Sequence, residues 1–478
     1  MGRTSLLLII AFNVTFMMMG FRMSNATSAA YEKYSGYLDI EQSGLAMESC
    51  ANIAIANALL DTARSSTINL CSNKTFFGKA GSNFSITQFP YLDPITNMQI
   101  GESLLVVANY PLTGTRNPFT GQIEQMYDTT YVKVQGNSIS QYVFYSVNDN
   151  SLNWNTGDTC RGRYHTQSGL SVNGNADFKG RVTTKGAVQV ANGANPNFEQ
   201  GYGKADVSLP TDLRELNKYG AMGGATSIIK KLDTYVQLNS DGSVTVRTEP
   251  PGTVQSSTTC WNESSTAKNA SPNGNIPKCT TYTSIAALTT SGVLLVQNAA
   301  LHIKGVLNGQ LTLGCVDTVN GSGVKSNLSQ VWIDGSITYK QDPPCSRNPH
   351  PNNPTNEIDM LGIVASNNIT VSQYVDHNGT AKVTLKNVNI DASMFTQGSF
   401  GAENYDSRGD CGDLTIVGGI QQNVRGAVVQ YTSPINGFHK DYDWDNNLLT
   451  HEPVGYPRTV FVVKNWVDVS KIPDDFWQ

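Results

Sequence analysis

The N-terminal stretch constrains this chain most, because it joins an apolar run directly to a helix-forming segment. Leu6 to Met19 is almost entirely apolar, and only Asn13 and Thr15 interrupt it. No proline occurs before Pro90, so no strong helix breaker separates the apolar run from the helix-forming segment. Beyond Ala29 apolar residues recur on one helical face, as in an amphipathic helix; they are Tyr34, Leu38, Leu45, Ile53 and Leu60. We therefore predict an anchor and a stalk helix within residues 1–66.

The residues allow three interpretations of this N-terminus. A cleavable signal peptide fits the positively charged start, the apolar core and the small residues between Ala26 and Ala30. An uncleaved membrane helix fits Leu6–Phe21, although such a helix usually has about 20 apolar residues and Asn13 would lie in the bilayer. The third interpretation is a very short leader that ends at Gly2, with a mature helix that begins at Arg3.

The composition is typical of an extracellular β-rich protein. Charged residues make up only 15% of the chain, and glycine, asparagine, serine and threonine are abundant. The formal net charge is −5 and no long basic tract occurs, which argues against a nucleic-acid-binding groove.

Cysteine spacing indicates the redox environment. None of the eight cysteines forms a Cys-x-x-Cys pair, which disfavours zinc and thioredoxin-type chemistry; they are Cys50, Cys71, Cys160, Cys260, Cys279, Cys315, Cys345 and Cys411. An even number behind a hydrophobic N-terminus favours disulfides in an oxidising compartment. Cys50–Cys71 and Cys260–Cys279 are the simplest local pairs, and buried free thiols are the alternative.

After Cys71 the sequence pattern changes to that of β-structure. A small β unit is predicted for residues 67–150, with strands at 103–110, 130–135 and 141–147. Residues 151–478 are predicted to form the main body. A short helical insertion is predicted near 211–232 with Thr211 as its N-cap, and 249–277 is predicted to be a surface excursion.

The body has the texture of a β-solenoid. Between Asn155 and Gly203, short apolar–polar alternations are separated by glycine or asparagine at steps of five to seven residues. Short strands with small residues at the corners are typical of parallel β-solenoid coils. The texture returns between Gly292 and Ile420, without a strict repeat length. The pattern therefore predicts an irregular β-helix or a stacked sheet.

The N-terminal segments resemble type IV pilin-like proteins, in particular minor pilins and pseudopilins. The resemblance rests on Gly2–Phe12, Tyr37–Met47 and Ala51–Leu60. In that family a glycine precedes an apolar helix, and an alanine-rich segment follows on the same helix. Arg3 and Leu7 depart from the family pattern, which has an apolar residue and a glutamate at these positions. The resemblance implies assembly with other pilin-like subunits.

The remainder, from about Tyr142 to the end, resembles uncharacterised bacterial envelope proteins that carry such an N-terminus. This resemblance implies a β-solenoid surface protein or pilus-associated protein and no enzymatic activity. The matching residues are 154–158, 162–166, 175–180, 309–312, 337–339, 359–365, 418–422, 425–427, 437–440, Tyr442, Trp444, Asp445, Pro457 and Trp466.

Four acidic residues form a possible calcium loop. Asp441, Asp443, Asp445 and Glu452 occupy positions 1, 3, 5 and 12 of that pattern. Asn446 stands where the loop requires glycine, so a solvated segment is the favoured interpretation.

Other candidate residues have structural interpretations that we favour. Asp158, Arg163 and His165 lie close in sequence, but no nucleophile or paired carboxylate accompanies them. Arg425 is predicted to be a buried or corner arginine. Six aromatic residues are possible sugar contacts, but core packing is favoured because strands are rich in aromatics; they are Tyr142, Tyr145, Trp332, Tyr339, Trp444 and Trp466.

The sequence thus predicts a mainly β protein with a long N-terminal α-helix and an irregular β-solenoid-like body. The expected function is a non-enzymatic, minor pilin-like or pseudopilin-like subunit of the cell envelope, anchored through Leu6–Phe21 or assembled in a surface filament. No catalytic, metal or cofactor-binding residue is assigned; the expected ligand is a surface glycan or a protein. One alternative is a secreted β-helix adhesin or glycan-binding protein that has lost Leu6–Ala30. The other is a β-helix carbohydrate-active enzyme.

Overall fold

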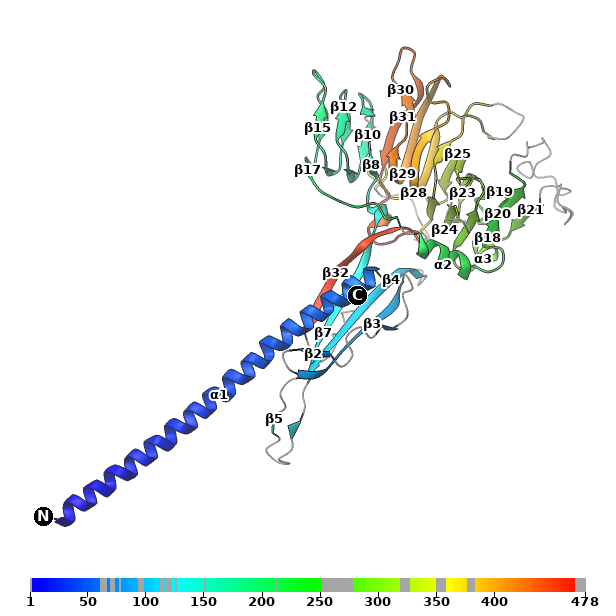
Figure 1. Ribbon diagram of the computed structural model, residues 1–478. Helices are drawn as coiled ribbons and strands as arrows, with labels where there is room; N and C mark the ends of the chain where they lie inside the picture. Colours follow the sequence, from blue (N-terminus) through cyan, green and yellow to red (C-terminus); the bar gives the residue numbers. More distant parts are fainter. Residues whose placement is uncertain are drawn as a thin grey trace. The chain divides into compact units, whose positions relative to one another are not determined.

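The computed structural model describes residues 2–60, 67–68, 74–76, 79–92, 99–111, 115–116, 123–124, 127–149, 152–211, 213–251, 278–318, 327–349, 358–375 and 383–468. The protein is mainly β with one long N-terminal helix, as the sequence predicts (Figure 1). The chain divides into two compact units. The first contains Met1–Phe89, Glu102–Gly136 and Phe461–Gln478, and the second contains Pro90–Gly101 and Asn137–Val460.

The first unit begins with helix α1 (Gly2–Leu60), which is 59 residues long without a break. At 1.5 Å per residue it spans about 90 Å. A sheet follows in the order β1-β3-β4-β7-β32, with β2 beside β3. Its strands and the β5–β6 hairpin have these bounds: β1 (Thr67–Ile68), β2 (Lys74–Phe76), β3 (Lys79–Leu92), β4 (Gln99–Pro111), β5 (Thr115–Arg116), β6 (Ile123–Glu124), β7 (Tyr127–Ser138) and β32 (Arg458–Asp468).

The last strand of this sheet comes from the C-terminal part of the chain. β32 lies beside β7, although more than 300 residues separate them in sequence. The main segment of the second unit, Asn137–Val460, is therefore inserted in the chain between two neighbouring strands of this sheet. Its own ends are close together as well, because the Ile139 N–H donates to the Pro457 carbonyl at 3.4 Å.

The second unit is a stack of rungs. Each rung is one coil of the chain and contains two or three short strands, which pair in parallel with the strands of the next rung. One continuous ladder, which we call ladder A, passes through Cα partners Ile228, Leu295, Gly314, Val364, Phe395, Gln421, Tyr145, His165, Thr183 and Gly203. Its strands, in spatial order, are β18 (Ile228–Lys230), β22 (Val293–Gln297), β24 (Gln310–Val316), β26 (Met360–Ala365), β28 (Val388–Ala402), β29 (Asp410–Arg425), β8 (Phe144–Asn148), β11 (Tyr164–Thr166), β14 (Val182–Thr184) and β17 (Tyr202–Lys204).

A second ladder, ladder B, runs beside it through Leu238, Gly305, Ile337, Ile390, Ile416, Tyr442, Cys160, Phe178 and Phe198. It adds strands β19 (Asp233–Leu238), β23 (Leu301–Leu307), β25 (Val331–Tyr339), β31 (Asn436–Asp443), β10 (Thr159–Arg161), β13 (Asp177–Phe178) and β16 (Asn197–Phe198) to the ends of β28 and β29.

A third ladder, ladder C, has two separate parts. The first part runs through Thr234, Leu301, Val331, Ile369, Phe400 and Arg425 and includes β27 (Ile369–Val371). The second part consists of β9 (Asn153–Trp154), β12 (Leu170–Val172) and β15 (Val188–Val190). β20 (Val244–Glu249), β21 (Lys278–Tyr282) and β30 (Val429–Gln430) pair antiparallel at the margins.

The spatial order of the rungs is a circular permutation of the chain order. The chain joins the stack in its middle, at β8, and proceeds outward to β17. It then crosses to the opposite end, at β18, and fills the stack until β29 and β31 meet β8 and β10. Both ends of the inserted unit consequently lie in the middle of the stack.

Apolar residues fill the stack and also cover one outer side of it. Inside, rings stack between rungs, as in Phe144 on Tyr164 and Phe178 on Phe198, each with centroids 5.1 Å apart. Outside, the crossing segment packs Leu216 and Tyr219 of α2 (Arg214–Met222) against outward-facing side chains such as Leu295. Because α2 covers this side, strands of ladder A such as β22 and β26 carry apolar residues on both their inner and their outer faces.

The helix predicted near 211–232 is shorter than expected. α2 ends at Met222, and Ile228–Lys230 forms strand β18, because these residues pair with Leu295–Gln297 of β22. Thr211 is not its N-cap; Leu213 occupies that position without a side-chain hydrogen bond. The excursion predicted at 249–277 lies almost entirely outside the described residues.

Candidate functional site

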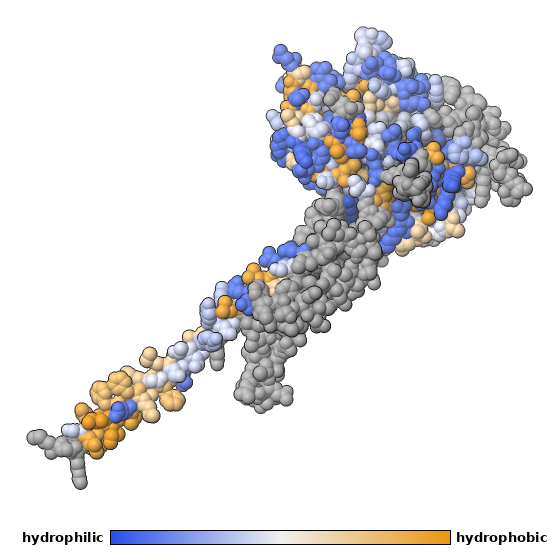
Figure 2. Space-filling view, viewed as in Figure 1, coloured by the Kyte–Doolittle hydropathy of each residue, from blue (hydrophilic) through white to orange (hydrophobic). Residues whose placement is uncertain are grey.

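Two features of the described residues are unusual for a folded β protein: an exposed apolar helix and a polar break inside the stack. In α1, Ser5–Ser35 is long and apolar enough to cross a membrane, as are some signal sequences, and it is not buried. Every large apolar residue from Leu6 to Met23 is exposed, with Leu8 at 68% and Met17 at 72%. Hydrophobic residues predominate on the N-terminal part of this helix, with a few polar residues among them (Figure 2).

The polar break lies where ladder C is interrupted. Here the side chain of Arg425, at the end of β29, makes hydrogen bonds that the backbone of a neighbouring strand would otherwise make. Its guanidinium donates to the Leu152 carbonyl at 2.8 Å and to the Asn153 carbonyl at 3.4 Å. Lys440 Nζ also donates to the Asn153 carbonyl, at 3.4 Å. Two buried cations thus satisfy backbone acceptors that a continuous sheet would pair with N–H groups.

Each of these cations has its own buried carboxylate. Arg425 Nη1 lies 2.9 Å from Asp149 Oδ2, and Lys440 Nζ lies 2.5 Å from Asp158 Oδ2. Asp149 also accepts from Ser146 at 3.0 Å and from the Tyr164 hydroxyl at 3.2 Å. The hydroxyl of Tyr431 donates to the second oxygen of Asp158.

Burial sets the proton affinities in this cluster. Loss of hydration lowers the pKa of Lys440 to about 8, although Asp158 opposes this shift. Burial raises the pKa of Tyr431, and the negative charge of Asp158 adds to the increase. Arg425 lies against the rings of Trp154 and Phe144, at 4.8 Å and 5.5 Å from their centroids.

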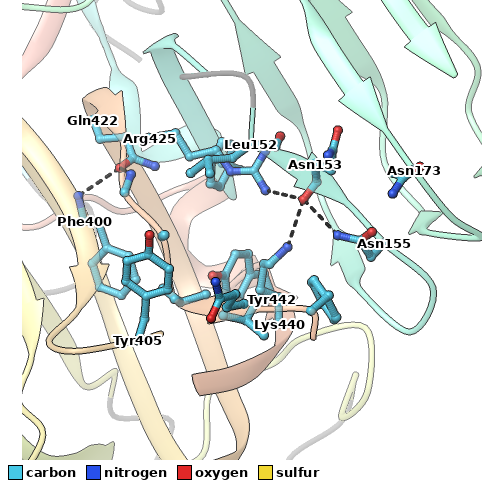
Figure 3. Close-up of a pocket in the computed structure, with 17 residues that line it drawn as sticks. Leu152, Asn153, Asn155, Asn173, Phe400, Tyr405, Gln422, Arg425, Lys440 and Tyr442 are labelled. Atoms are coloured by element: carbon cyan, nitrogen blue, oxygen red, sulfur yellow. Dashed lines mark hydrogen bonds between the residues drawn. The ribbon is translucent and has the colours of Figure 1, made fainter. Parts of the chain in front are cut away.

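A pocket of about 310 Å³ opens at this break (Figure 3). Buried rings of Phe144, Phe400 and Tyr442 line its interior. Asn153 and Asn173 are exposed, and Asn155, Tyr405 and Tyr431 are half-buried, so polar groups surround its outer part. The complete lining is Phe144, Leu152, Asn153, Asn155, Asn173, Phe400, Tyr405, Gln422, Arg425, Gly426, Ala427, Val428, Val429, Gln430, Tyr431, Lys440 and Tyr442.

The structure does not bring Asp158, Arg163 and His165 into one group. Asp158 contacts Lys440 and Tyr431 in the buried cluster. His165 Nδ1 lies 2.8 Å from the Thr183 hydroxyl, and burial lowers its pKa to about 4. Arg163 is exposed and donates to Gln141 at 3.0 Å.

The four acidic residues of the possible calcium loop have different partners, and the expectation of a solvated segment is wrong, because Asp443, Asp445 and Glu452 are buried. Asp441 pairs with Arg161 and, at 2.6 Å, with Arg347. Asp443 is buried and accepts four hydrogen bonds, from the backbone N–H groups of 346, 347 and 444 and from the Arg347 side chain. Asp445 accepts from Asn447 N–H, where η2 (Asn446–Leu449) begins, and Glu452 pairs with Arg458. Among the described residues no group of three or more His, Cys, Asp or Glu could hold a metal ion.

The predicted structural roles of Arg425 and two of the aromatic residues are confirmed. Arg425 is buried, as are Tyr145 and Tyr339. Trp444 is half-buried and donates to the Ser140 carbonyl at 3.1 Å, and Tyr142 and Trp332 are also half-buried. The side chain of Trp466 lies outside the described residues.

The even number of cysteines does not correspond to four disulfides. Cys160, Cys315, Cys345 and Cys411 are buried free thiols. Cys279 is disulfide-bonded, whereas the side chains of Cys50, Cys71 and Cys260 lie outside the described residues. The two predicted local pairs therefore stay predictions.

Sequence reasoning singled out Arg425 but did not predict the pocket and did not connect the other residues that line it. Asn153, Tyr405 and Lys440 come from three distant segments, and no local motif connects them. Only Lys440 could have been noticed in the sequence, because a charged residue there occupies a position that the alternation of its strand predicts to be buried.

Comparison with protein-family models gives no match, and comparison with curated protein sequences gives none either. Among solved structures, the chain is similar to the crystal structure of the competence-associated pilin ComZ from Thermus thermophilus. The sequence identity is 12%, the TM-score is 0.31, and the alignment covers 91% of this chain and 98% of ComZ. A similarity at this level does not establish a shared fold.

Proposed function

We propose that this chain is a non-enzymatic, pilin-like subunit of the cell envelope. Its N-terminal helix anchors it in the membrane and then packs among the helices of other subunits in a surface filament. The β-rich second unit is the part displayed outside the membrane. The observation that carries the proposal is the exposed apolar surface of α1.

The distribution of apolar residues around α1 supports this role. Leu6, Leu7, Leu8, Ile9 and Ile10 are consecutive, so they point to all sides of the helix at 100° intervals. A helix that is apolar all around requires a lipid environment or a shell of other helices. Lipid and neighbouring helices both bury the same apolar residues. One helix can therefore hold the subunit in the membrane and later pack in the filament.

The helix beyond this apolar segment supports contact with other subunits. Tyr34, Leu38 and Leu45 remain exposed at 61%, 38% and 54%. They recur at helical spacing among exposed polar residues such as Glu41 and Glu48. Such a stripe suits packing against neighbouring helices of the same kind, as the resemblance to pilin-like proteins implies.

The chemistry of the second unit is consistent with display rather than catalysis. Each cation in its pocket is paired, Lys440 with Asp158 and Arg425 with Asp149. A general acid or base needs a titratable group that is free to contact a substrate. The alternative roles are a secreted adhesin and a β-helix carbohydrate-active enzyme.

The deciding experiment is the N-terminal sequence of the mature protein from its native cell, combined with its distribution between membrane, sheared filaments and medium. A start at Met1 or Arg3, with the protein in membranes or filaments, supports the proposal. A start near Tyr31 removes the apolar helix and overturns it. Recovery of the full-length protein in membranes alone would support the anchor and contradict the filament.

A further inference from the structure

We propose that the pocket beside Arg425 and Lys440 binds one neutral sugar ring at the end of a glycan. This inference rests on the second unit alone. It therefore stands or fails independently of the membrane anchor and the filament.

The pocket lies beside two buried ion pairs of the stack. Ladders A and B continue without interruption past this level, through Gln421 to Tyr145 and through Tyr442 to Cys160. Only ladder C is broken, and two buried ion pairs fill the break. Replacement of buried ion pairs by apolar residues is often neutral or stabilising, so stability alone does not explain these four charges. A binding role would account for the break in ladder C and for the pocket beside it.

The lining combines the two kinds of surface that a sugar ring presents. A pyranose has apolar C–H faces and hydroxyl groups around its edge. Phe400 and the half-buried Tyr405 offer aromatic faces for the C–H groups. Asn153, Asn155 and Asn173 offer amide groups that both donate and accept hydrogen bonds, as hydroxyl groups require.

The side-chain amides retain capacity for a ligand. Asn155 Nδ2 donates to the Asn153 carbonyl over a long 3.4 Å, which leaves its second N–H and its oxygen available. Gln422 is committed differently, because its Oε1 accepts from the backbone N–H groups of Phe400 and Gly426. Gln422 therefore shapes the pocket, and the three asparagines lie on the other side of the pocket from Gln422 and Phe400 (Figure 3).

Charge and size restrict the ligand to a neutral ring. Arg425 and Lys440 are each neutralised by one carboxylate, so an anionic sugar would have to displace Asp149 or Asp158. The pocket volume of about 310 Å³ lies at the lower end of the range for ligand sites, about 300–1,000 Å³. It accommodates a single ring, with the remainder of a glycan outside.

The test uses the full-length protein in lauryldimethylamine oxide, a detergent without a sugar headgroup. Saturation-transfer NMR would be recorded with glucose, galactose, mannose and N-acetylglucosamine, and with N-acetylneuraminate as the anionic comparison. A ligand of this size is expected to bind with a Kd of about 1 mM. Tyr405→Ala and Asn155→Ala are each expected to weaken binding about tenfold or more.

Matched controls are available outside the pocket. Tyr202→Ala and Asn195→Ala remove the same side-chain types from exposed positions, and both should leave binding unchanged. Transfer to at least one neutral sugar that is lost in both pocket variants supports the proposal. The absence of transfer to all four neutral sugars overturns it, as does binding of N-acetylneuraminate alone. Equal binding by the pocket variants and the controls would also overturn it.

Discussion

Lys440 Nζ lies 2.5 Å from Asp158 Oδ2, although 282 residues separate the two in sequence. Asp158 belongs to the first rung that the chain builds, and Lys440 belongs to β31, in the last rung. The pair therefore joins the two halves of the permuted stack at the level where ladder C is broken. Burial lowers the pKa of Lys440 to about 8 despite Asp158, so lost hydration outweighs the attraction between the charges.

Loss of one member of this pair should destabilise the fold. Lys440→Met leaves the Asp158 carboxylate buried without its cation, so we expect the free energy of unfolding to fall by about 3–5 kcal/mol. The double variant Lys440→Met/Asp158→Leu should recover most of this loss. Urea unfolding followed by circular dichroism measures both. Lys179→Met is the matched control, because the Lys179 side chain is 40% exposed, and its loss of unfolding free energy should be much smaller. Equal losses in the two single variants would contradict this account.

Asp445 should make stability depend on pH. Burial raises its pKa to about 7, with Asp391 contributing, whereas an unfolded aspartate titrates near about 3.9. The protonated form is the one the fold prefers, so its stabilising contribution is complete below about pH 4 and is lost as the pH rises through about 7.

Asp445→Asn should isolate this contribution. Asparagine is neutral at every pH. Its side-chain oxygen can still accept the hydrogen bond that the Asn447 N–H donates to Asp445 Oδ1 at 2.9 Å in the wild type. The variant should exceed the wild type by about 2–4 kcal/mol at pH 8, and the difference should shrink at pH 5. Urea unfolding at the two pH values measures it. A difference that is the same at both values would show that Asp445 does not titrate in this range.

Gly180 should tolerate no side chain, because it lies at a corner between two rungs. A Cβ there would overlap the carbonyl group of Gly162 in the rung below it. We expect Gly180→Ala to cost about 1–3 kcal/mol of unfolding free energy. Gly335→Ala is the control, since its nearest neighbour is Lys304 Cβ at 3.3 Å, which needs to move by only a few tenths of an ångström. Thermal unfolding compares the two variants, and a larger loss for Gly335→Ala would contradict the clash.

Local sequence patterns predicted the elements well and their spatial order poorly. The continuous helix follows from the absence of proline up to Pro90, and α1 extends from Gly2 to Leu60. The predicted strands at 103–110 and 130–135 lie within β4 and β7. Both signals are local, because they depend on helix breakers and on alternation along one segment.

Long-range order could not be predicted in the same way. His165, Thr183 and Gly203 follow at steps of 18 and 20 residues, but Gly314 and Val364 on the same ladder are 50 residues apart. Insertions of such different length conceal the repeat in the sequence. The permuted order of the rungs also conceals which strands are neighbours. Gln421 pairs with Tyr145, although the two lie near opposite ends of the second unit in sequence. The pocket depends on this pairing, so its residues could not be recognised without the fold.

The four buried thiols should react only when the protein unfolds. Cys160, Cys315, Cys345 and Cys411 are buried, and burial also raises the pKa of the Cys345 thiol, which disfavours the reactive thiolate. Maleimide labelling without reductant should leave these four unlabelled in the native protein and label them in urea. Peptide mapping by mass spectrometry identifies the sites. Labelling of any of the four under native conditions would contradict their burial.

The apolar segment of α1 should be sensitive to charge, whereas the stalk should not be. Phe12 and Phe16, near the middle of Leu6–Phe21, are each 64% exposed, so arginine at either position fits the isolated helix without steric conflict. In a bilayer, each arginine near the centre of the span costs about 2.5–3.5 kcal/mol. Phe12→Arg/Phe16→Arg should therefore move the protein from the membrane pellet to the soluble fraction after a high-salt wash.

Tyr37→Arg is the matched control for this prediction. Tyr37 is 61% exposed on the same helix but lies beyond Ser35, where the apolar segment ends. This variant should stay in the pellet, because a charge outside the hydrocarbon region remains hydrated. If the double variant also stays in the pellet, the helix does not hold the protein in the membrane. If wild type and variants are all soluble and begin near Tyr31, the segment is a signal peptide, and the second unit acts as a secreted protein.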